Sequence, residues 1–351
     1  MSRVDPGQAL VIGFAGTEVP PMIREALAAG QLGGLILFKR NIESAAQVHE
    51  LLSGLRYPAE LPPLLAVDQE GGRVARLRDP VVTLPPMRAL GETATEAQLR
   101  DTGETLGRQL AALGFTMDFA PVLDVDSNPA NPVIGDRAFG PTPESVIARA
   151  LPFAAGLRAG GVLPCGKHFP GHGDTDVDSH LALPRLTHER GRLDAVELAP
   201  FRAAVAAGLE ALMTAHVLFD ALDPELPATL SRTVLQGLLR EELGYEGLII
   251  SDDLEMKAVA DRWGVADSAV RAIDAGCDTL LVCSDVDAAF EAREALAARA
   301  RGDEAFAARL EDGCARSLAL RRARPPAPVA ELDESVFALA PALAKLLESV
   351  A

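Results

Sequence analysis

The feature that most constrains the fold is a repeated alternation of short apolar segments with helical patterns along 351 residues. The apolar segments rarely alternate with polar residues, which is typical of parallel strands that are covered on both faces. They predict eight strands, over residues 9–16, 33–39, 64–69, 115–123, 161–167, 210–217, 247–252 and 278–283. Helices are predicted over 21–29, 43–56, 95–113, 143–159, 194–207, 232–242, 265–275, 286–300 and 304–322.

Eight strand-helix units predict an α/β fold, a closed (β/α)8 TIM-type barrel in a single domain. A doubly wound open sheet is the alternative. No Gly-x-Gly-x-x-Gly turn follows the first strand, so a dinucleotide-binding fold has no support. We expect the catalytic barrel to occupy residues 1–325 and a C-terminal tail or helix to occupy 326–351, because too little chain remains for a second α/β domain.

The composition narrows the classes of partner. The net charge is −17, from 50 acidic and 33 basic residues, which argues against nucleic acid or an anionic membrane surface. The four cysteines show no disulfide or zinc-ribbon spacing, as expected in a reducing cytosol. The N-terminus does not look like a signal peptide, and no apolar run is long enough to span a bilayer. We therefore expect a cytoplasmic protein.

Polar residues follow five of the predicted strands. A barrel of this kind carries its functional residues at the carboxyl ends of the strands and in the loops that follow them. The expected rim segments are Asp68-Gln69-Glu70-Gly71-Gly72-Arg73 with Arg76, residues 118–126 and 135–140, Lys167 with His168, Thr214-Ala215-His216, and Ser251-Asp252-Asp253-Leu254. Five polar ends on one rim predict a functional site there.

The densest of these segments runs from Lys167 to His180. It holds three of the six histidines, together with Asp174, Asp176 and Asp178 at alternate positions. Imidazoles and carboxylates are costly to bury and rarely needed for folding alone. A solvated loop with turn-capping aspartates is the plain alternative. His188, a little further on, is expected to have no functional role.

Two hypotheses assign a chemical function to this loop, a metal site and a catalytic pair. The aspartates resemble the start of a calcium loop, but Ser179 stands where Gly is needed and Arg185 where Glu is needed. The histidine spacings do not match a helical zinc motif. The other reading is a catalytic pair, in which the carboxylate of Asp178 fixes the tautomer of His180 and raises its basicity.

The chain resembles the bacterial β-N-acetylglucosaminidases of glycoside hydrolase family 3, the single-domain enzymes of peptidoglycan recycling. The matching motifs are Val67-Asp68-Gln69-Glu70-Gly71-Gly72-Arg73-Val74 with Arg76, Gly135-Asp136-Arg137, Lys167-His168-Phe169-Pro170-Gly171-His172-Gly173 with Asp178-Ser179-His180, and Ser251-Asp252-Asp253-Leu254. The resemblance covers the barrel from the first to the eighth strand. The loop from Lys167 to His180 is its most specific part.

The resemblance implies a retaining exo-β-N-acetylglucosaminidase that releases terminal N-acetylglucosamine from muropeptides through a covalent glycosyl-enzyme. Asp252 matches the nucleophile. His180, held by Asp178, replaces the second carboxyl that retaining glycosidases commonly use. Adjacent strand residues point to opposite sides, so only one of Asp252 and Asp253 is expected to face the barrel mouth. The resemblance implies that this residue is Asp252, and Asp253 is then expected to be structural. The implied substrate ligands are Asp68, Arg76, Arg137, Lys167 and His168.

Several alternatives stay open. Salt bridges across the rim could explain Arg137, Lys167 and Arg73, and either His216 or Asp124 could support the ligands from behind. A phosphorylase that uses phosphate as the acceptor, a non-catalytic sugar-binding protein and a metal-dependent hydrolase are further possibilities. We expect a small-molecule glycan substrate, no cofactor and no metal.

Overall fold

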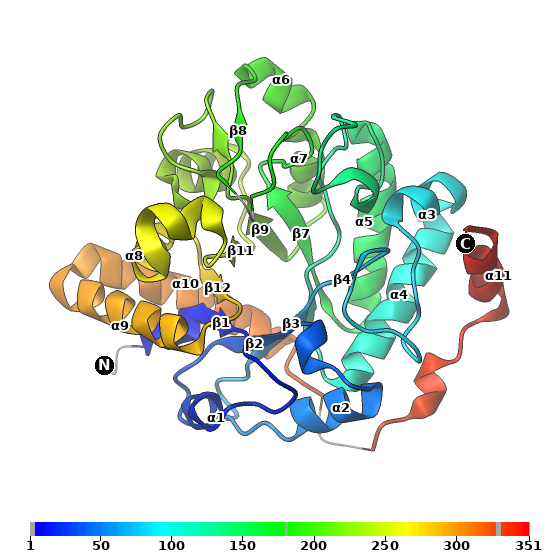
Figure 1. The fold of residues 1–351 in the computed structure, drawn as a ribbon, viewed down its shortest axis with the longest axis horizontal. Coiled ribbons are helices and arrows are strands. Elements are labelled where there is room, and N and C mark those ends of the chain that lie inside the picture. The colour runs from blue at the N-terminus through cyan, green and yellow to red at the C-terminus, as the bar shows by residue number, and fades with distance from the viewer. Residues whose placement is uncertain (1–3, 180–181, 328–330, 351) are drawn as a thin grey trace.

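The computed structural model describes residues 4–179, 182–327 and 331–350, and its centre is a closed barrel of parallel strands (Figure 1). Around the barrel the order is β1-β12-β11-β9-β7-β6-β3-β2, so strands that are adjacent in space are consecutive barrel strands along the chain. The barrel strands are β1 (Leu10–Ile12), β2 (Gly34–Leu37), β3 (Leu64–Val67), β6 (Met117–Asp118), β7 (Leu163–Phe169), β9 (Ala211–Thr214), β11 (Leu248–Asp253) and β12 (Thr279–Val282). The predicted (β/α)8 fold is confirmed.

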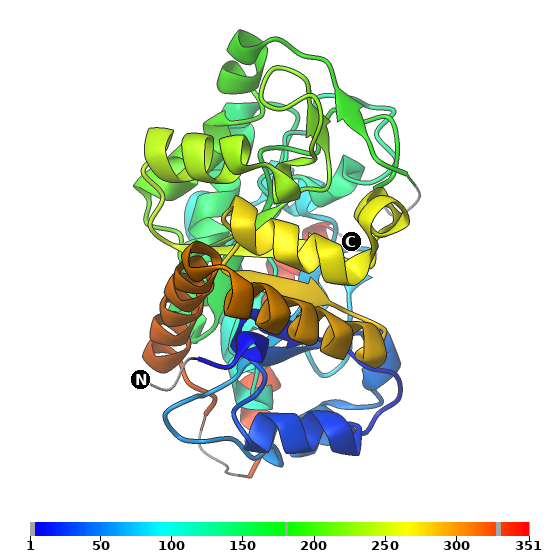
Figure 2. The ribbon, with the colours of Figure 1, turned by 90° about the vertical axis from the view of Figure 1, so that its left-hand side faces the viewer.

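Helices surround the barrel. They are α1 (Pro21–Ala28), α2 (Ala45–Ser53), α4 (Glu96–Leu113), α5 (Pro143–Gly160), α7 (Ala199–Ala206), the π-helical segment η5 (Thr233–Glu242), α8 (Lys257–Ala275), α9 (Val286–Gly302) and α10 (Glu304–Ala323). Figure 2 shows α8, α9 and α10 side by side against the strands that close the barrel. Helices α4 and α5 form the most extensive helix pair, beside β7 (Figure 1).

The sequence explains why α4 and α5 begin, end and pack as they do. Thr95 caps the start of α4 and Thr142 the start of α5, each accepting a hydrogen bond from a backbone N–H of the first turn. Between the two helices, a Cβ on Gly103 would lie 2.2 Å from the carbonyl oxygen of Phe153. Glycine at this position therefore allows a close approach that any other residue would prevent.

The interior of the barrel is filled by side chains from every strand. This inner layer is apolar and contains Val11, Ile36, Leu64, Ala66, Met117, Phe119, Leu163, Cys165, Ala211, Met213, Leu248, Ile250, Leu281 and Cys283. A second apolar layer lies between the strands and the surrounding helices. The strands are thus buried on both faces, which is why their sequences read as short apolar runs.

A predicted strand and a predicted helix extend too far, and a proline in the sequence explains each difference. The fourth strand was expected over 115–123, but β6 ends at Asp118, and Val122 rejoins the sheet only as a bridge to Lys167. Pro121 lies in the gap, and proline has no N–H to donate to a sheet. The helix expected over 194–207 is two helices, α6 (Arg190–Ala195) and α7, because Pro200 fits in the first turn of a helix but not in its interior.

The helix expected over 265–275 is longer than predicted. Helix α8 begins at Lys257, and Gly264 has a non-helical φ of 71° inside it. The predicted start thus coincides with a kink at Gly264, and a separate helical segment precedes it. Glycine takes this positive φ without the steric cost that a side chain would add.

Short strands and one helix follow the carboxyl ends of the barrel strands. A hairpin of β4 (Gln69–Gly71) and β5 (Val74–Ala75) follows β3, and helix α3 (Met87–Thr93) follows the hairpin. Beyond β7, strands β8 (Arg185–Leu186) and β10 (Leu218–Phe219) pair in parallel. None of these was predicted, because pairs of two or three residues leave no periodic pattern.

After α10 the chain returns to the barrel. Helix α11 (Pro341–Val350), dark red in Figure 1, lies against α3 and α4. Its buried side chains are Leu343 and Leu346. A helix in the expected tail is thus present, and the proposed boundary near residue 325 stays a prediction.

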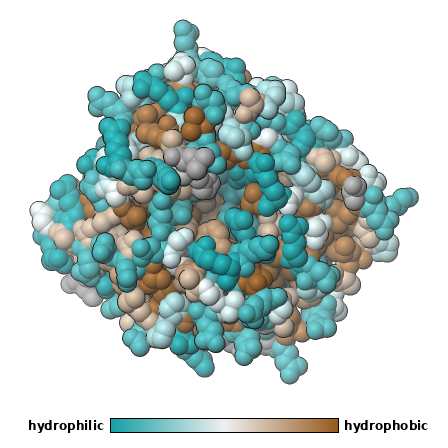
Figure 3. Space-filling model, viewed as in Figure 1, coloured by the Kyte–Doolittle hydropathy of each residue, from teal (hydrophilic) through white to brown (hydrophobic). Residues whose placement is uncertain are grey.

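The surface and the cysteines agree with the composition. All four cysteines are free and buried. The face drawn in Figure 3 is mostly hydrophilic, with small scattered apolar patches. Within the described ranges, none of the helices combines the length and the apolar character needed to cross a bilayer.

Candidate active site

A pocket of about 170 Å³ lies at the carboxyl ends of the barrel strands. Its wall combines an apolar base with a polar rim, and side chains from segments far apart in sequence meet there. Six of the residues predicted from the sequence line it: Asp68, Arg76, Arg137, Lys167, His168 and Asp252. Phe38, Phe119, Met213, Met256 and Leu281 supply much of its apolar surface. The geometry required for a site on the barrel rim is thus present.

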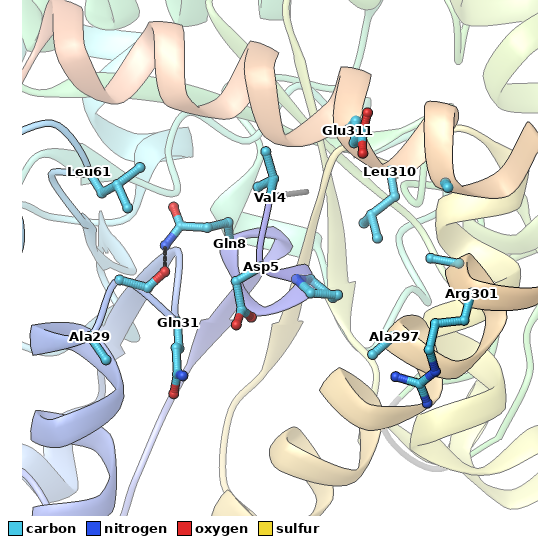
Figure 4. Close-up of a pocket in the computed structure, with 14 residues that line it drawn as sticks. Val4, Asp5, Gln8, Ala29, Gln31, Leu61, Ala297, Arg301, Leu310 and Glu311 are labelled. Atoms are coloured by element: carbon cyan, nitrogen blue, oxygen red, sulfur yellow. Dashed lines mark hydrogen bonds between the residues drawn. The ribbon is translucent and has the colours of Figure 1, made fainter. Parts of the chain in front are cut away.

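A larger hollow, of about 550 Å³, lies at the opposite end of the barrel (Figure 4). Gln8 and Gln31, which precede β1 and β2, line it together with Arg301 of α9 and Leu310 of α10. The Gln8 amide donates to the carbonyl oxygens of Gly30 and Leu32, so this side chain already has partners. Residues at this end of a (β/α)8 barrel stabilise the fold, whereas active sites lie at the carboxyl ends of the strands. We therefore place the active site at the rim pocket.

The polar wall of the rim pocket is one continuous chain of ion pairs. Lys167 Nζ lies 2.8 Å from Asp68 Oδ1 and 2.6 Å from Glu70 Oε1. Arg76 donates to the other oxygen of Asp68 at 3.1 Å. Arg137 donates to both carboxylate oxygens of Glu70, at 2.9 and 2.8 Å. The order is therefore Arg76, Asp68, Lys167, Glu70, Arg137, with opposite charges alternating.

These pairs fix the charges of the side chains. Burial alone would raise the pKa of Asp68, but Lys167 and Arg76 together hold it well below its usual range. Burial opposes ionisation of Glu70 too, yet Arg137 and Lys167 hold its pKa at about 2. Burial would likewise lower the pKa of Lys167, and the two carboxylates raise it instead. Each ligand is thus held in its charged form and in a fixed place.

His168 is held from behind by a buried carboxylate. Asp124 Oδ2 lies 2.7 Å from His168 Nδ1, and Asp124 Oδ1 accepts the backbone N–H of His172 at 2.7 Å. Burial would raise the pKa of Asp124, but His168 and the hydrogen bonds it accepts lower it. An ionised Asp124 makes Nδ1 of His168 the protonated nitrogen, so Nε2 is left to face the pocket.

A second set of hydrogen bonds connects His172 to the segment that carries Asp178. Asn131 Nδ2 donates to Thr175 Oγ1, and Thr175 Oγ1 lies 2.7 Å from His172 Nδ1. His172 Nε2 lies 3.0 Å from Ser179 Oγ. Burial lowers the pKa of His172 to about 4, so the imidazole is neutral at pH 7. With Thr175 as donor, His172 donates to Ser179 and thereby holds the residue next to Asp178.

Asp252 and Asp253 both line the pocket, and the expectation that only the side chain of Asp252 faces the barrel mouth stays a prediction. The register of β11 against β12 shifts between Ile250 and Asp253, which breaks the regular alternation of sides. The predicted structural role of Asp253 fits its contacts, because its Oδ1 accepts the backbone N–H groups of Glu255 and Cys283. Burial raises the pKa of Asp253 to about 7.

The predicted catalytic pair is described only in part. Asp178 is half-buried, and its backbone carbonyl accepts a hydrogen bond from the N–H of Ala182. The next residue, Ser179, lines the pocket. His180 lies outside the described residues. The relation between Asp178 and His180 therefore stays a prediction.

Arg73, His216 and Glu70 differ in how they contribute to the pocket. Arg73 points to the backbone carbonyl of Ile134 at 3.2 Å and does not line the pocket. His216 Nε2 donates to the backbone carbonyl oxygen of Asp253 at 2.9 Å, and its Nδ1 lies 2.8 Å from Thr229 Oγ1, so His216 supports the end of β11. Glu70 was not singled out as a ligand, although it is the most buried carboxylate of the wall, with its side chain 1% exposed. Its place two residues after Asp68 was the available signal.

Comparisons with known proteins agree with this site. Residues 7–316 match the model of the glycosyl hydrolase family 3 N-terminal domain. The chain is 42% identical over 288 residues to a β-hexosaminidase of Thiobacillus denitrificans, with 80% of each protein covered. A family 3 β-N-acetylglucosaminidase from Paenibacillus sp. superposes with a TM-score of 0.92 at 40% identity, over 100% of this chain and 68% of that one.

A protein of similar length gives the same result. NagZ from Neisseria gonorrhoeae superposes with a TM-score of 0.78 at 33% identity, and the match covers 97% of this chain and 96% of NagZ. The single-barrel architecture is thus common to both. With the family match and the rim pocket together, this chain belongs to glycosyl hydrolase family 3, as a glycoside hydrolase of the β-hexosaminidase type.

Proposed function

We propose that the chain is a retaining exo-β-N-acetylglucosaminidase that acts through a covalent glycosyl-enzyme. The observation that carries this proposal is the position of Asp252, at the end of β11 in the pocket that the chain of ion pairs from Arg76 to Arg137 also lines. One carboxylate thus faces a fixed set of hydrogen-bonding groups. This is what a glycosidase needs in order to hold a sugar while its anomeric carbon is attacked.

In the first step the Asp252 carboxylate attacks the anomeric carbon, and the bond to the leaving-group oxygen breaks. His180 gives its proton to that oxygen, so the aglycone leaves as an alcohol. In the second step His180 takes a proton from water, the oxygen of that water attacks the anomeric carbon, and Asp252 is released as a carboxylate. Asp178 orients His180 throughout. The histidine pKa of about 6.5 in water suits both proton transfers near neutral pH.

The remaining side chains hold the sugar. Asp68 accepts hydrogen bonds from hydroxyl groups, while Arg76, Arg137 and Lys167 donate to hydroxyls and to the N-acetyl group. His168, whose Nδ1 donates to Asp124, presents Nε2 as an acceptor to a sugar hydroxyl. Because these groups are already paired with one another or with Asp124, they are in place before the sugar arrives. A sugar that leaves one of them unpaired loses affinity.

The relatives support the proposed substrate class. NagZ from Neisseria gonorrhoeae has been solved with N-trifluoroacetyl-D-glucosamine, an N-acylated glucosamine. We propose N-acetylglucosaminyl muropeptides as the natural substrates, and the cytoplasm, where peptidoglycan fragments are recycled, as the location. The support for both is the resemblance of the loop motifs described above.

The test is a comparison of three chromogenic substrates that differ only in the sugar: the β-N-acetylglucosaminide, the β-glucoside and the β-N-acetylgalactosaminide. We expect the first to be cleaved with a kcat/KM at least about 100-fold above the second, since a missing N-acetyl group leaves buried donors unpaired. Equal cleavage of the glucoside would contradict the proposed specificity. Adding inorganic phosphate to the assay separates hydrolysis from phosphorolysis, because only a phosphorylase releases the sugar 1-phosphate.

A further inference from the structure

Three potential metal ligands meet outside the sugar pocket. One ligand atom from each of Asp174, His188 and Glu197 lies within 4.8 Å of the other two. None of the three lines the rim pocket. Their spacing in the sequence does not indicate a shared metal site, because His188 follows Asp174 by fourteen residues and Glu197 follows His188 by nine.

Each ligand comes from a different local element, and the neighbouring elements β8, α6 and α7 lie in the upper part of Figure 1. Asp174 belongs to the loop that follows β7, His188 follows β8, and Glu197 lies between α6 and α7. His188 Nε2 and Asp174 Oδ2 are already in hydrogen-bond contact. A tetrahedral zinc ion with bonds of about 2.0–2.2 Å needs its ligand atoms about 3.4 Å apart, so a small contraction is sufficient.

Glu197 provides an independent sign that this cluster is incomplete. Its side chain is 3% exposed, and within the described part of the chain its Oε2 has no hydrogen-bond partner. Arg192 reaches the other oxygen, Oε1, at 3.1 Å, and it lies 3.6 Å from Asp174 Oδ2. A buried carboxylate oxygen without a partner is costly unless something binds it.

We propose that Asp174, His188 and Glu197 form a binding site for a divalent transition-metal ion, with Zn²⁺ as the preferred ion. Imidazole nitrogen and carboxylate oxygen are both zinc ligands, and three protein ligands leave a fourth position for water. An imidazole ligand disfavours Mg²⁺ and Ca²⁺, which prefer oxygen donors alone. Arg192, 38% exposed at its side chain, can turn toward solvent as the ion takes over its role.

The ion would connect the loop after β7 to the segment before α7. That loop already packs on Glu197, because a Cβ added to Gly171 would lie 2.8 Å from Glu197 Cβ. Zinc would therefore stabilise the fold at this contact without entering the sugar chemistry. This inference does not rest on the proposed function, and turnover in the presence of a chelator remains the expectation.

The experiment is a zinc titration of the full chain by calorimetry, after chelator treatment and dialysis. We expect His188→Gln and Glu197→Gln to weaken binding at this site by more than about ten-fold, or to lose one equivalent of zinc. His49→Gln and Glu242→Gln are the matched controls, since His49 lies on α2 and Glu242 pairs with Arg190 at the exposed end of η5. Zinc binding identical in all five proteins would overturn the proposal.

A second variant keeps the test decisive if a ligand variant fails to fold. Arg192→Leu removes the positive charge that competes with the ion, so it should bind zinc several-fold more tightly than the wild type. A purely structural ion-pair cluster would instead lose stability in this variant and show no gain in zinc affinity, which would also overturn the proposal. Visible absorption of bound Co²⁺ in place of zinc reports a tetrahedral site directly, and it should vanish in His188→Gln.

Discussion

Glu70 is the carboxylate on which the polar wall of the pocket depends, and its replacement by glutamine gives a quantitative test. Its side chain is 1% exposed, and it pairs with Arg137 through both oxygens and with Lys167 at 2.6 Å. Glu70→Gln keeps the shape of the side chain and removes its charge. Arg137 then loses its carboxylate partner, and Lys167 is left with Asp68 alone.

The magnitude follows from the pKa. The pKa of Glu70 is held at about 2, against 4.5 for an ordinary glutamate. By linkage, this difference corresponds to roughly 3 kcal/mol of folding free energy at neutral pH. Removing one partner from a buried ion pair costs about 3–5 kcal/mol in other proteins, so two separate routes agree. The midpoint of thermal unfolding should fall by about 4 °C for a chain of this size.

The pH dependence has a definite sign. A carboxyl whose folded pKa is lowered stabilises the fold above its ordinary pKa, and this contribution is lost as the pH falls toward the folded value. The difference between wild type and Glu70→Gln should therefore be constant from pH 7 to about pH 5. It should shrink below pH 4.5, as the pH approaches 2.

Urea unfolding at a series of pH values measures this difference. Glu242→Gln is the matched control, because Glu242 pairs with Arg190 and Arg202 while 42% of its side chain is exposed. Exposed pairs contribute about 0–1 kcal/mol, so the control should change little. If Glu70→Gln is no more destabilising than the control, the ion-pair wall does not stabilise the fold and the reasoning is refuted.

Three further predictions concern the chemistry and its supports. His180→Ala should slow the cleavage of natural glycans far more than that of substrates with an activated leaving group, and Asp178→Ala should show the same pattern in milder form; equal losses on both substrates would place the acid/base elsewhere. Turnover should survive exhaustive chelation, and a loss restored by one specific metal would contradict this. Asp124→Asn should raise the KM more than it lowers kcat, because Asp124 orients His168 by a 2.7 Å contact, and an unchanged KM in steady-state kinetics would count against that role.

The fold was predictable because its strands are buried on both faces. Apolar runs such as Leu64–Val67 and Thr279–Val282 are short and separated by helical patterns, and only a few architectures bury eight of them. The ends of the elements were less predictable. Pro121 and Pro200 each mark a boundary that the hydrophobic pattern alone extends too far, since periodicity does not register a missing N–H.

The membership of the site was also predictable, and its pairing was not. Asp68, Lys167 and Asp252 lie at strand ends, and a barrel brings such ends together. Which carboxylate meets which cation depends on the β4–β5 hairpin, which turns Glu70 into the pocket and left no pattern in the sequence. The register shift in β11, which places Asp253 beside Asp252 in the pocket wall, was equally invisible.

The central claim is that Asp252 is the nucleophile of a retaining glycosidase. A fluorinated N-acetylglucosaminyl fluoride slows the breakdown of the covalent intermediate, so the sugar stays attached to the residue that attacked it. Peptide mapping by mass spectrometry then identifies that residue. The account predicts one sugar per chain, on Asp252, and no label in Asp252→Ala. A label on Asp253 or Asp178, or near-normal turnover by Asp252→Ala, would contradict it.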